Sequence, residues 1–480
     1  MLVYRTLTLS MVSLLLGGCG AGALLHPFLY APRSETKPWI PSYKERALVN
    51  SVQAESSLEI PLASDVVSLG DLFAISLHNS PETRESWASA REAAATYAEA
   101  LSSYFPTISF DGQYLKEKLG IQLDNIFAFT DNTSWGPEVE LSYLLWDFGT
   151  RKQNAELYFQ ALESMNWKYN EKLQKVLQSV AKTYYDHLYA KSLLSALEAD
   201  LLNAKEIYES ASLKFETGIF SETDMLQAKT NFLQKQVAVT AEIAEVQNSF
   251  INLLKTVGIP CTASFETGSF PEAPVPDSFA SNLTKLLTTA WQERPDYLAS
   301  KAFVLSQEAV VKKVKAEVLP KVEVTAEGGQ QWYKGGFTDH GNYIVQLDLT
   351  FPIFSGFYYV NQIRAKESAL QKAIAEMQQV ELTIVSEVKI AYNNFMTAKQ
   401  QIKDTKSYLD AARIEFMAMK ERYSMGVVTI LDILSAFSFL SDARAKVVRS
   451  EREYFVSLIN IAFATGMLST ATPHIIEAKR

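Results

Sequence analysis

The chain has 480 residues, of which 48% are hydrophobic and 21% are charged, and its formal net charge is -9. This composition is that of a folded protein. The negative charge argues against nucleic acid as the main partner, because phosphate binding needs a basic surface, and five histidines with two cysteines leave little material for a metal site.

Residues 1–18 are predicted to be a signal peptide. The apolar run Leu7–Leu16 is too short to cross a bilayer as a helix. It ends in Leu16-Gly17-Gly18-Cys19, which resembles the box at which bacterial lipoproteins are cleaved and acylated. We therefore expect a covalent lipid on Cys19, with an ordinary signal peptide as the alternative. The mature chain would then keep only Cys261 and form no internal disulfide.

Two turns far apart in the chain share a sequence pattern. The first reads FETGIFSETDMLQA from Phe215, and the second reads YSMGVVTILDILSA from Tyr423. INLLKTVG, which ends at Gly258, matches INIAFATG, which ends at Gly466, at the same offset. We therefore predict two internal repeats, residues 67–258 and 282–466. The remaining segments are predicted as an extended arm (19–66), a linker rich in Pro and Ser (259–281) and a tail (467–480).

Each repeat is predicted to contain the same elements in the same order. A helical stretch comes first, over 67–104 and 282–319, and a proline ends it. Apolar residues at every second place then predict strands, and steps of three or four predict helices. The predicted strands are 106–117, 136–146, 320–328 and 342–354, the long helices 149–216 and 357–424, the tip turns 217–221 and 425–429, and the return helices 222–257 and 430–465.

The shared turn has the residues that reverse a helix. Gly218 suits the left-handed position just past a helix end. Ser221 is a good N-cap for the next helix, and Asp224 completes a capping box. Phe220 and Met225 stand where a hydrophobic staple would place them. The second turn repeats the device with Gly426, Val428, Thr429, Asp432 and Ile433.

The four predicted strands are apolar on one face and polar, largely acidic, on the other. This alternation is typical of a transmembrane β-barrel, although a soluble sheet half-covered by the helices has the same period. Four strands cannot close a barrel, and open edges in lipid leave backbone groups unpaired. We therefore predict a mixed α and β membrane protein, in which a long antiparallel helical barrel continues into a transmembrane β-barrel completed by other copies of the chain.

Taken together, these features resemble the TolC-like outer-membrane factor family. The resemblance rests on the duplicated turn, on the strand-to-helix junctions LLWDFG and PIFSGF, and on the corners at Asn79 and Arg294. It implies the exit duct of an efflux or type I secretion system in the outer membrane of a Gram-negative bacterium. It also implies a homotrimer with a shared twelve-stranded barrel, whose periplasmic tips meet a membrane-fusion adaptor and an inner-membrane pump.

The resemblance and the pattern together nominate three groups of residues. The tip turns are expected to dock the adaptor through exposed Ile219, Phe220, Val427 and Val428, although the turn residues also serve simply to shape the turn. The full tip set is Gly218, Ile219, Phe220, Ser221, Asp224, Gly426, Val427, Val428, Thr429 and Asp432. The candidates for a periplasmic gate are Asp404, Asp410 and Glu415. The lumen is expected to prefer cations, because it would be lined by Asp111, Glu138, Glu140, Glu323, Glu327 and Asp348.

Other functions are weighed against the channel. The sequence has no GxSxG, P-loop, HExxH or CxxC pattern, so we expect no enzyme activity, no catalytic residue, no metal and no cofactor other than the lipid on Cys19. A lipid-anchored coiled-coil tether without a pore would also explain the long helices. It would not explain paired amphipathic strands at matching places in both repeats.

Overall fold

The computed structural model describes residues 26–40, 66–123, 126–218, 221–271, 282–334 and 340–469. The chain divides into two compact units. We call them the strand unit (1–33, 89–166 and 299–378) and the helix unit (34–88, 167–298 and 379–480). The signal peptide, the lipidation box, residues 272–281 of the predicted linker and the tail after residue 469 lie outside the described residues.

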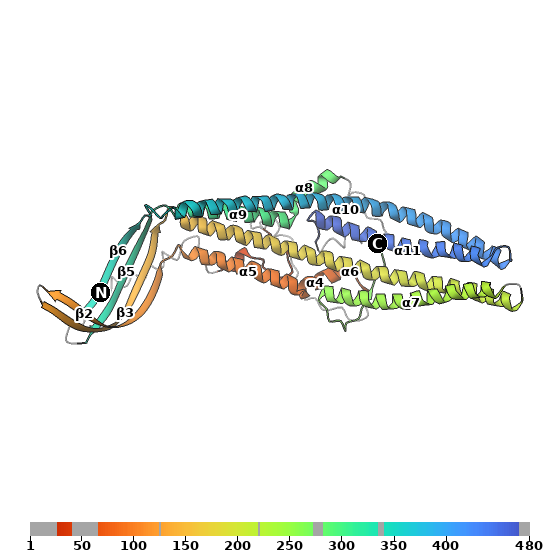
Figure 1. The fold of residues 1–480 in the computed structure, drawn as a ribbon, viewed down its shortest axis with the longest axis horizontal. Coiled ribbons are helices and arrows are strands. Elements are labelled where there is room, and N and C mark those ends of the chain that lie inside the picture. Colours follow the sequence, from red (N-terminus) through yellow and green to blue (C-terminus); the bar gives the residue numbers. More distant parts are fainter. Residues whose placement is uncertain are drawn as a thin grey trace. The chain divides into compact units, whose positions relative to one another are not determined.

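The same order of elements occurs twice along the chain (Figure 1). The first series is α4 (Leu69–Asn79), α5 (Pro81–Ser102), β2 (Thr107–Leu123), β3 (Ile126–Trp146), α6 (Thr150–Glu216) and α7 (Glu222–Val257). The second is α8 (Leu283–Glu293), α9 (Pro295–Ala316), β5 (Lys321–Tyr333), β6 (His340–Thr350), α10 (Tyr358–Ser424) and α11 (Ile430–Ala464). Three short elements complete the described chain: η1 (Pro27–Tyr30), β1 (Val66–Val67) and β4 (Glu266–Thr267).

The first helical stretch of each series differs from the prediction, which made it continuous. The structure has two helices there, broken before Pro81 and before Pro295. Ser80 (φ -65°, ψ 122°) and Arg294 (φ -70°, ψ 120°) are extended. A proline ring pushes the preceding residue out of the helical region and cannot donate to the previous turn, so each proline starts a new helix instead of continuing the old one.

The strand unit holds one antiparallel sheet of four strands in the order β2-β3-β5-β6 (Figure 1). The prediction that the first strand ends at 117 and the second begins at 136 is wrong, because β2 and β3 stay paired from Thr107 opposite Ser142 to Leu123 opposite Ile126. Leu119, Ile121 and Leu123 continue the alternation, but the prediction ended the strand in the charged run Lys116–Lys118 that precedes them. β5 likewise runs past the predicted end at 328. β6 begins two residues early and stops at Thr350 rather than 354, since Pro352 has no N–H to pair.

The helix unit is built from two hairpins of helices. α7 runs back beside α6, and α11 runs back beside α10 (Figure 1). Their ends pack on one apolar cluster, which we call the tip cluster. Its buried members are Ala204, Ile207, Ala211, Ala228, Phe416, Tyr423, Ile430, Ile433, Phe437 and Leu440. In the described part of the chain, no helix combines the length and apolar character needed to cross a membrane.

The N-terminal arm is described only over residues 26–40 and at Val66. It is not wholly extended as predicted, because Pro27–Tyr30 forms a short 3-10 helix, consistent with proline at its first position. In the strand unit, Asn166 of α6 donates to the Tyr30 carbonyl (2.8 Å). In the helix unit, the Asn170 side chain exchanges two hydrogen bonds with the backbone of Trp39 (2.7 and 2.8 Å). Side chains of α6 therefore satisfy the arm's backbone groups.

Candidate functional site

The sheet has one continuous apolar face. Residues that pair directly across antiparallel strands share a face, so the register puts Ile108, Leu141, Ala326 and Val345 in one row. Ile108 and Val345 are each 69% exposed in the single chain. A single sheet therefore offers rows of large apolar side chains that no other described part of the chain covers.

Aromatic side chains border this apolar face. Tyr114 lies opposite Trp135, and Trp135 lies opposite Trp332, so three strands contribute to one aromatic row. Tyr343, which is 84% exposed, pairs with Gly328 nearer the middle of the sheet. Rows of Trp and Tyr at the edge of an apolar band are typical of the level of lipid headgroups.

The opposite face of the sheet carries the six acids nominated as a lumen. The register joins them into three cross-strand pairs, in which Asp111 faces Glu138, Glu140 faces Glu327 and Glu323 faces Asp348. Like charges directly opposite each other are destabilising. One of the pairs is partly offset by hydrogen bonds, since Ser142 donates to Glu323 (2.6 Å) and Gln346 donates to its partner Asp348 (2.6 Å).

Both outer strands of the sheet have an open edge. β2 pairs only with β3, and β6 pairs only with β5, within the described part of the chain. An open edge is a row of backbone donors and acceptors ready to pair with another strand. In lipid each unpaired group costs several kcal/mol, so an apolar sheet with two free edges requires a partner for each edge.

The first tip turn connects α6 and α7. Gly218 adopts a left-handed conformation (φ 74°), and its N–H donates to the Phe215 carbonyl (2.9 Å). Ser221 and Asp224 form a reciprocal capping box at the start of α7. The capping box predicted for Ser221 and Asp224 is therefore confirmed. Ile219 and Phe220, like Cys19, lie outside the described residues.

The second tip turn connects α10 and α11. Gly426 is left-handed (φ 77°), and the N–H of Val427 reaches back to the Arg422 carbonyl (3.0 Å). Thr429 and Asp432 form the capping box. The Thr429 side chain and backbone hydrogen bond to Asp432, and these bonds hold the pKa of its carboxyl below the usual range.

One expected docking residue is not fully exposed. Val427 is 70% exposed, whereas Val428 is half-buried and packs against the tip cluster. The prediction of an exposed Val428 is therefore wrong. A hydrophobic residue just before an N-cap commonly packs on the first turn of its helix, and Ile433, the expected staple partner, belongs to the same cluster. Met425, which was not predicted, is 66% exposed beside Val427.

The nominated gate acids lie together on the later part of α10. Asp404, Asp410 and Glu415 are all exposed. Asp404 accepts a hydrogen bond from Gln400 (2.8 Å), one helical turn earlier. The contacts of these acids with the described residues do not single out one of the three as a gate.

A buried ionic cluster in the helix unit was missed from the sequence. Asp200 of α6 is 1% exposed and lies 2.5 Å from the guanidinium of Arg444 on α11. Lys235 of α7 approaches the same carboxylate at 3.6 Å, and Ser441 donates to it. The cluster joins both helix hairpins. No local motif marks Asp200, because its partners stand far away in sequence.

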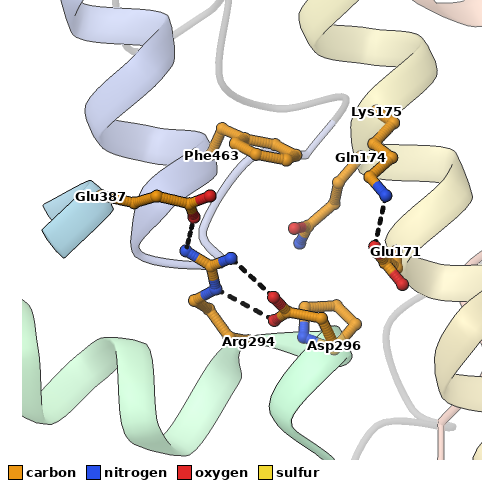
Figure 2. Close-up of a pocket in the computed structure, with 8 residues that line it drawn as sticks. Glu171, Gln174, Lys175, Arg294, Asp296, Glu387 and Phe463 are labelled. Carbon is orange, nitrogen blue, oxygen red and sulfur yellow. Dashed lines mark hydrogen bonds and ion pairs between the residues drawn. The ribbon is translucent and has the colours of Figure 1, made fainter. Parts of the chain in front are cut away.

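A second ionic cluster lines a small cavity of about 120 Å³ in the helix unit (Figure 2). Arg294 is 5% exposed and forms a bidentate pair with Asp296 (2.9 and 2.6 Å). It also donates to Glu387 (2.6 Å) and to the Ala464 carbonyl (3.3 Å). Burial opposes its charge, yet the bonds to Asp296 and Glu387 raise the pKa of Arg294. Because these contacts occupy the guanidinium, the cluster fastens the α8–α9 corner to α10 and α11.

Across the described ranges, no three His, Cys, Asp or Glu side chains gather closely enough to hold a metal ion. The polar groups of the molecule serve instead as helix caps, as ion pairs between helices and as one acidic sheet face.

Comparisons with known proteins show which family has this architecture. The sequence model of the family described as "Outer membrane efflux protein" matches residues 72–258 and 286–467. Outer membrane efflux protein BepC of Brucella suis is 24% identical over 339 residues, which are 69% of this chain and 72% of BepC. Outer membrane protein TolC of Escherichia coli is 21% identical over 410 residues, covering 82% of this chain and 80% of TolC.

A solved structure gives the same answer for the fold. The outer membrane protein VceC of Vibrio cholerae superposes with a TM-score of 0.74 at 17% identity, over 83% of this chain and 96% of VceC. The predicted combination of long helices and a small sheet in a TolC-like fold is thereby confirmed. The two matched segments of the family model together span well over half of the chain, and the chain belongs to the outer membrane efflux protein family.

Proposed function

We propose that the chain is the outer-membrane exit duct of an efflux or type I secretion system and conducts substrates passively to the cell exterior. The observation that carries this proposal is the sheet with an apolar face, an acidic face and two open edges. Membership of the outer membrane efflux protein family supplies the membrane and the class of process. Passive conduction through such a duct requires no enzymatic step and no cofactor.

Closure of the barrel is proposed to need three copies of the chain. β6 of one copy would pair with β2 of the next, which gives twelve strands around one axis. A twelve-stranded barrel is wider than the eight-stranded kind that side chains fill. The helix hairpins of the three copies would continue the conduit into the periplasm, and each repeat would contribute one long helix and its shorter return helix. This homotrimer rests on the open edges and on the family resemblance.

The acidic face of the sheet is proposed to line the lumen. Three cross-strand carboxylate pairs per copy would give a strongly negative interior, which favours cations over anions. The lining acids are Asp111, Glu138, Glu140, Glu323, Glu327 and Asp348. The periplasmic gate is proposed among Asp404, Asp410 and Glu415, because a three-fold axis would bring three copies of one acid together.

The tip turns are proposed to dock a periplasmic membrane-fusion adaptor, which links the duct to an inner-membrane pump. Exposed Met425 and Val427 offer apolar contact, and the glycines and capping boxes fix the shape of the turn. The docking set is Gly218, Ile219, Phe220, Ser221, Asp224, Gly426, Val427, Thr429 and Asp432, with Val428 assigned to the tip cluster instead. Cys19 is proposed to carry the covalent lipid.

Reconstitution into planar bilayers tests the function. The purified full chain is expected to produce discrete single-channel currents carried mainly by cations, and to have the mass of three chains under native conditions. A single copy without conductance would favour the lipid-anchored tether. Anion-dominated current would leave the duct in place but overturn the role of the acidic face.

A further inference from the structure

One side of α6 carries a row of lysines within the helix unit. Steps of three and four residues place side chains on the same side of a helix, and Lys168, Lys172, Lys175 and Lys182 stand on one such side. We call these four residues the lysine stripe. Lys172 is half-buried and the other three are exposed. At 1.5 Å per residue, the stripe is about 21 Å long.

Two lysines of the stripe carry charges that the chain does not balance. Lys172 forms an ion pair with Glu82 of α5 (2.7 Å), and Lys175 pairs with an acid one turn earlier on α6. The side chains of Lys168 and Lys182 form no hydrogen bond or ion pair with any described residue. One unbalanced positive charge therefore stands at each end of the stripe.

The opposite side of α6 is covered by two other segments of the chain. Asn170 and Lys191 stand on that side by the 3.6-residue period of the helix. Asn170 bonds to the backbone of Trp39 in the N-terminal arm. Lys191 donates to the Thr267 carbonyl (3.0 Å), in the segment that follows α7. A duct must keep its interior clear, so these two segments belong on its outer surface, and the lysine stripe then faces the lumen.

The fold itself does not require lysines on this side of a long helix. At the offset that aligns the two tip turns, Lys175 and Lys182 of α6 correspond to Thr383 and Ile390 of α10. Both of these α10 residues are exposed. The same architecture therefore accepts neutral side chains at such positions, and neither helix formation nor packing accounts for the row of charge on α6.

A polar cleft of about 450 Å³ between α6, α7 and α11 adjoins the end of the stripe. Asp186, about one turn beyond Lys182, lines this cleft and pairs with Arg452 of α11 (2.5 Å). Lys255 and Glu245 of α7 also line it, and neither forms an ion pair with a described residue. The charges of the cleft nearly balance one another, so it adds polar groups beside the stripe without cancelling the positive charge of the stripe.

We propose that the lysine stripe is a luminal binding site for elongated, multiply charged anions in the helix-lined part of the conduit. An extended chain of about six residues is about 20 Å long, so one such polyanion reaches both Lys168 and Lys182. Three copies around one axis would place three stripes on the same lumen and raise the local concentration of anions. This inference rests on the proposed function, because it requires the helices to enclose a lumen.

The acidic sheet face restricts where such an anion binds. Its carboxylates repel the ligand that the lysine stripe attracts. A polyanion should therefore reach the stripe from the helix-bearing end of the conduit and not from the sheet end. The side from which it acts becomes a measurable property of the site.

Block of single-channel current by hexaglutamate tests the site in the full chain. The protein is inserted into a planar phosphatidylcholine bilayer from one side, and hexaglutamate is added to each side in turn. It should block the current from the side of the helices, at concentrations at which free glutamate does not. The block should weaken strongly between about 0.1 M and about 1 M salt, because the screening length falls from about 10 Å to about 3 Å.

Three variants separate the charge of the stripe from other causes of block. Lys168→Gln with Lys182→Gln should raise the half-blocking concentration about tenfold at low salt. Lys168→Arg with Lys182→Arg keeps both charges and should retain the block. The matched control is Lys37→Gln, which removes an exposed lysine of the arm and should change nothing. Equilibrium dialysis with labelled hexaglutamate measures binding independently of current.

The outcomes distinguish the site from the duct. Block that persists unchanged in the double Gln variant would overturn the site, and so would block from the sheet side alone. Binding in dialysis without block of current would place the stripe outside the lumen and overturn the site as well. Conducting channels that neither bind hexaglutamate nor are blocked by it would leave the duct intact and contradict the site. Absence of any conductance would contradict the proposed function itself, together with the site that rests on it.

Discussion

The carboxylate of Asp200 and the guanidinium of Arg444 lie 2.5 Å apart although 244 positions separate them in the chain. Asp200 is almost fully buried, and Lys235 lies within 3.6 Å of it. α6, α7 and α11 each supply a member of this cluster. It therefore connects the first helix hairpin to the second through charge, in addition to the apolar contacts of the tip cluster.

Removing this carboxylate should loosen the contact between the hairpins. Asp200→Ala leaves Arg444 and Lys235 beside each other without their shared anion, which should cost about 3 kcal/mol of local stability. Hydrogen exchange of the α11 amides around Arg444 measures that loss. The control is Glu206→Ala, because the ion pair of Glu206 with Lys420 also joins the two hairpins but is far more exposed to solvent and should contribute below about 1 kcal/mol. Equal effects of the two variants would contradict the role of the buried cluster.

Three left-handed glycines form a graded series. Gly218, Gly258 and Gly466 have φ of 74°, 81° and 75°. A Cβ on Gly218 meets nothing within 4 Å, one on Gly258 approaches the Asn79 backbone to 3.2 Å, and one on Gly466 approaches the Glu293 backbone to 2.7 Å. Gly218→Ala should therefore cost about 1 kcal/mol from conformation alone. Gly466→Ala should cost about 3 kcal/mol, because backbone must also move.

Thermal denaturation of the three purified variants ranks them directly. The expected order of destabilisation is Gly466→Ala, then Gly258→Ala, then Gly218→Ala. If Gly218→Ala were as damaging as Gly466→Ala, steric clearance would not be the cause, and the helix-end packing described for Gly466 would be contradicted.

The buried imidazole of His187 should make the helix unit sensitive to mild acid. Burial, with the nearby charge of Lys191, lowers the pKa of His187 to about 4, from 6.5, while Ser249 keeps it hydrogen-bonded at 3.0 Å. The unfolded chain then binds the proton first, so this contribution is complete above pH 6.5 and is lost as the pH falls toward 4. The loss should amount to about 2–3 kcal/mol.

Unfolding of the wild type and of His187→Gln between pH 7 and pH 4 measures this term. Gln can still bond to Ser249 but does not titrate, so its stability should depend less steeply on pH. The matched control is His78→Gln, since His78 is exposed. A wild-type slope retained in His187→Gln would rule out this imidazole as the sensor.

Neutralising one cross-strand acid pair should reduce the preference for cations. Glu140 and Glu327 face each other on the acidic face of the sheet. Glu140→Gln with Glu327→Gln removes two charges per copy and relieves a repulsion of up to about 1 kcal/mol. The reversal potential across a salt gradient should move toward zero, while Glu92→Gln on the exposed side of α5 should leave it unchanged. An unaltered potential in the double variant would place these acids outside the conduction path.

Local patterns in the sequence predicted the local structure well. Capping boxes at Ser221 and Thr429 form as their spacing indicates, and each long helix ends at the predicted residue, Glu216 or Ser424. These features depend on residues within one turn of each other. The alternation in the strands likewise predicted which side chains share a face, because that depends only on the period of a strand.

Features that depend on tertiary packing were not predictable. Glu140 faces Glu327 because of the register between β3 and β5. The alternation within each strand does not specify that register. Asp200 and Arg294 were assigned no partners, because Arg444 and Glu387 come close only when helices pack. The end of β6 at Thr350 is a different case. Pro352 was visible in the sequence, yet the apolar alternation beyond it was followed as far as Phe354.

Intermolecular cross-linking between β2 and β6 tests the central claim most directly. Variants carry Cys261→Ser, one cysteine at Ser109 and a second at Gln346, Asp348 or Thr350, so that several registers are sampled. A disulfide forms only when the two Cα atoms lie within about 7 Å. Oxidation of the protein in membranes should give a ladder of one, two and three linked chains that stops at three. No linked chains at any register, or a ladder that ends at two or runs past three, would contradict a barrel closed by three copies.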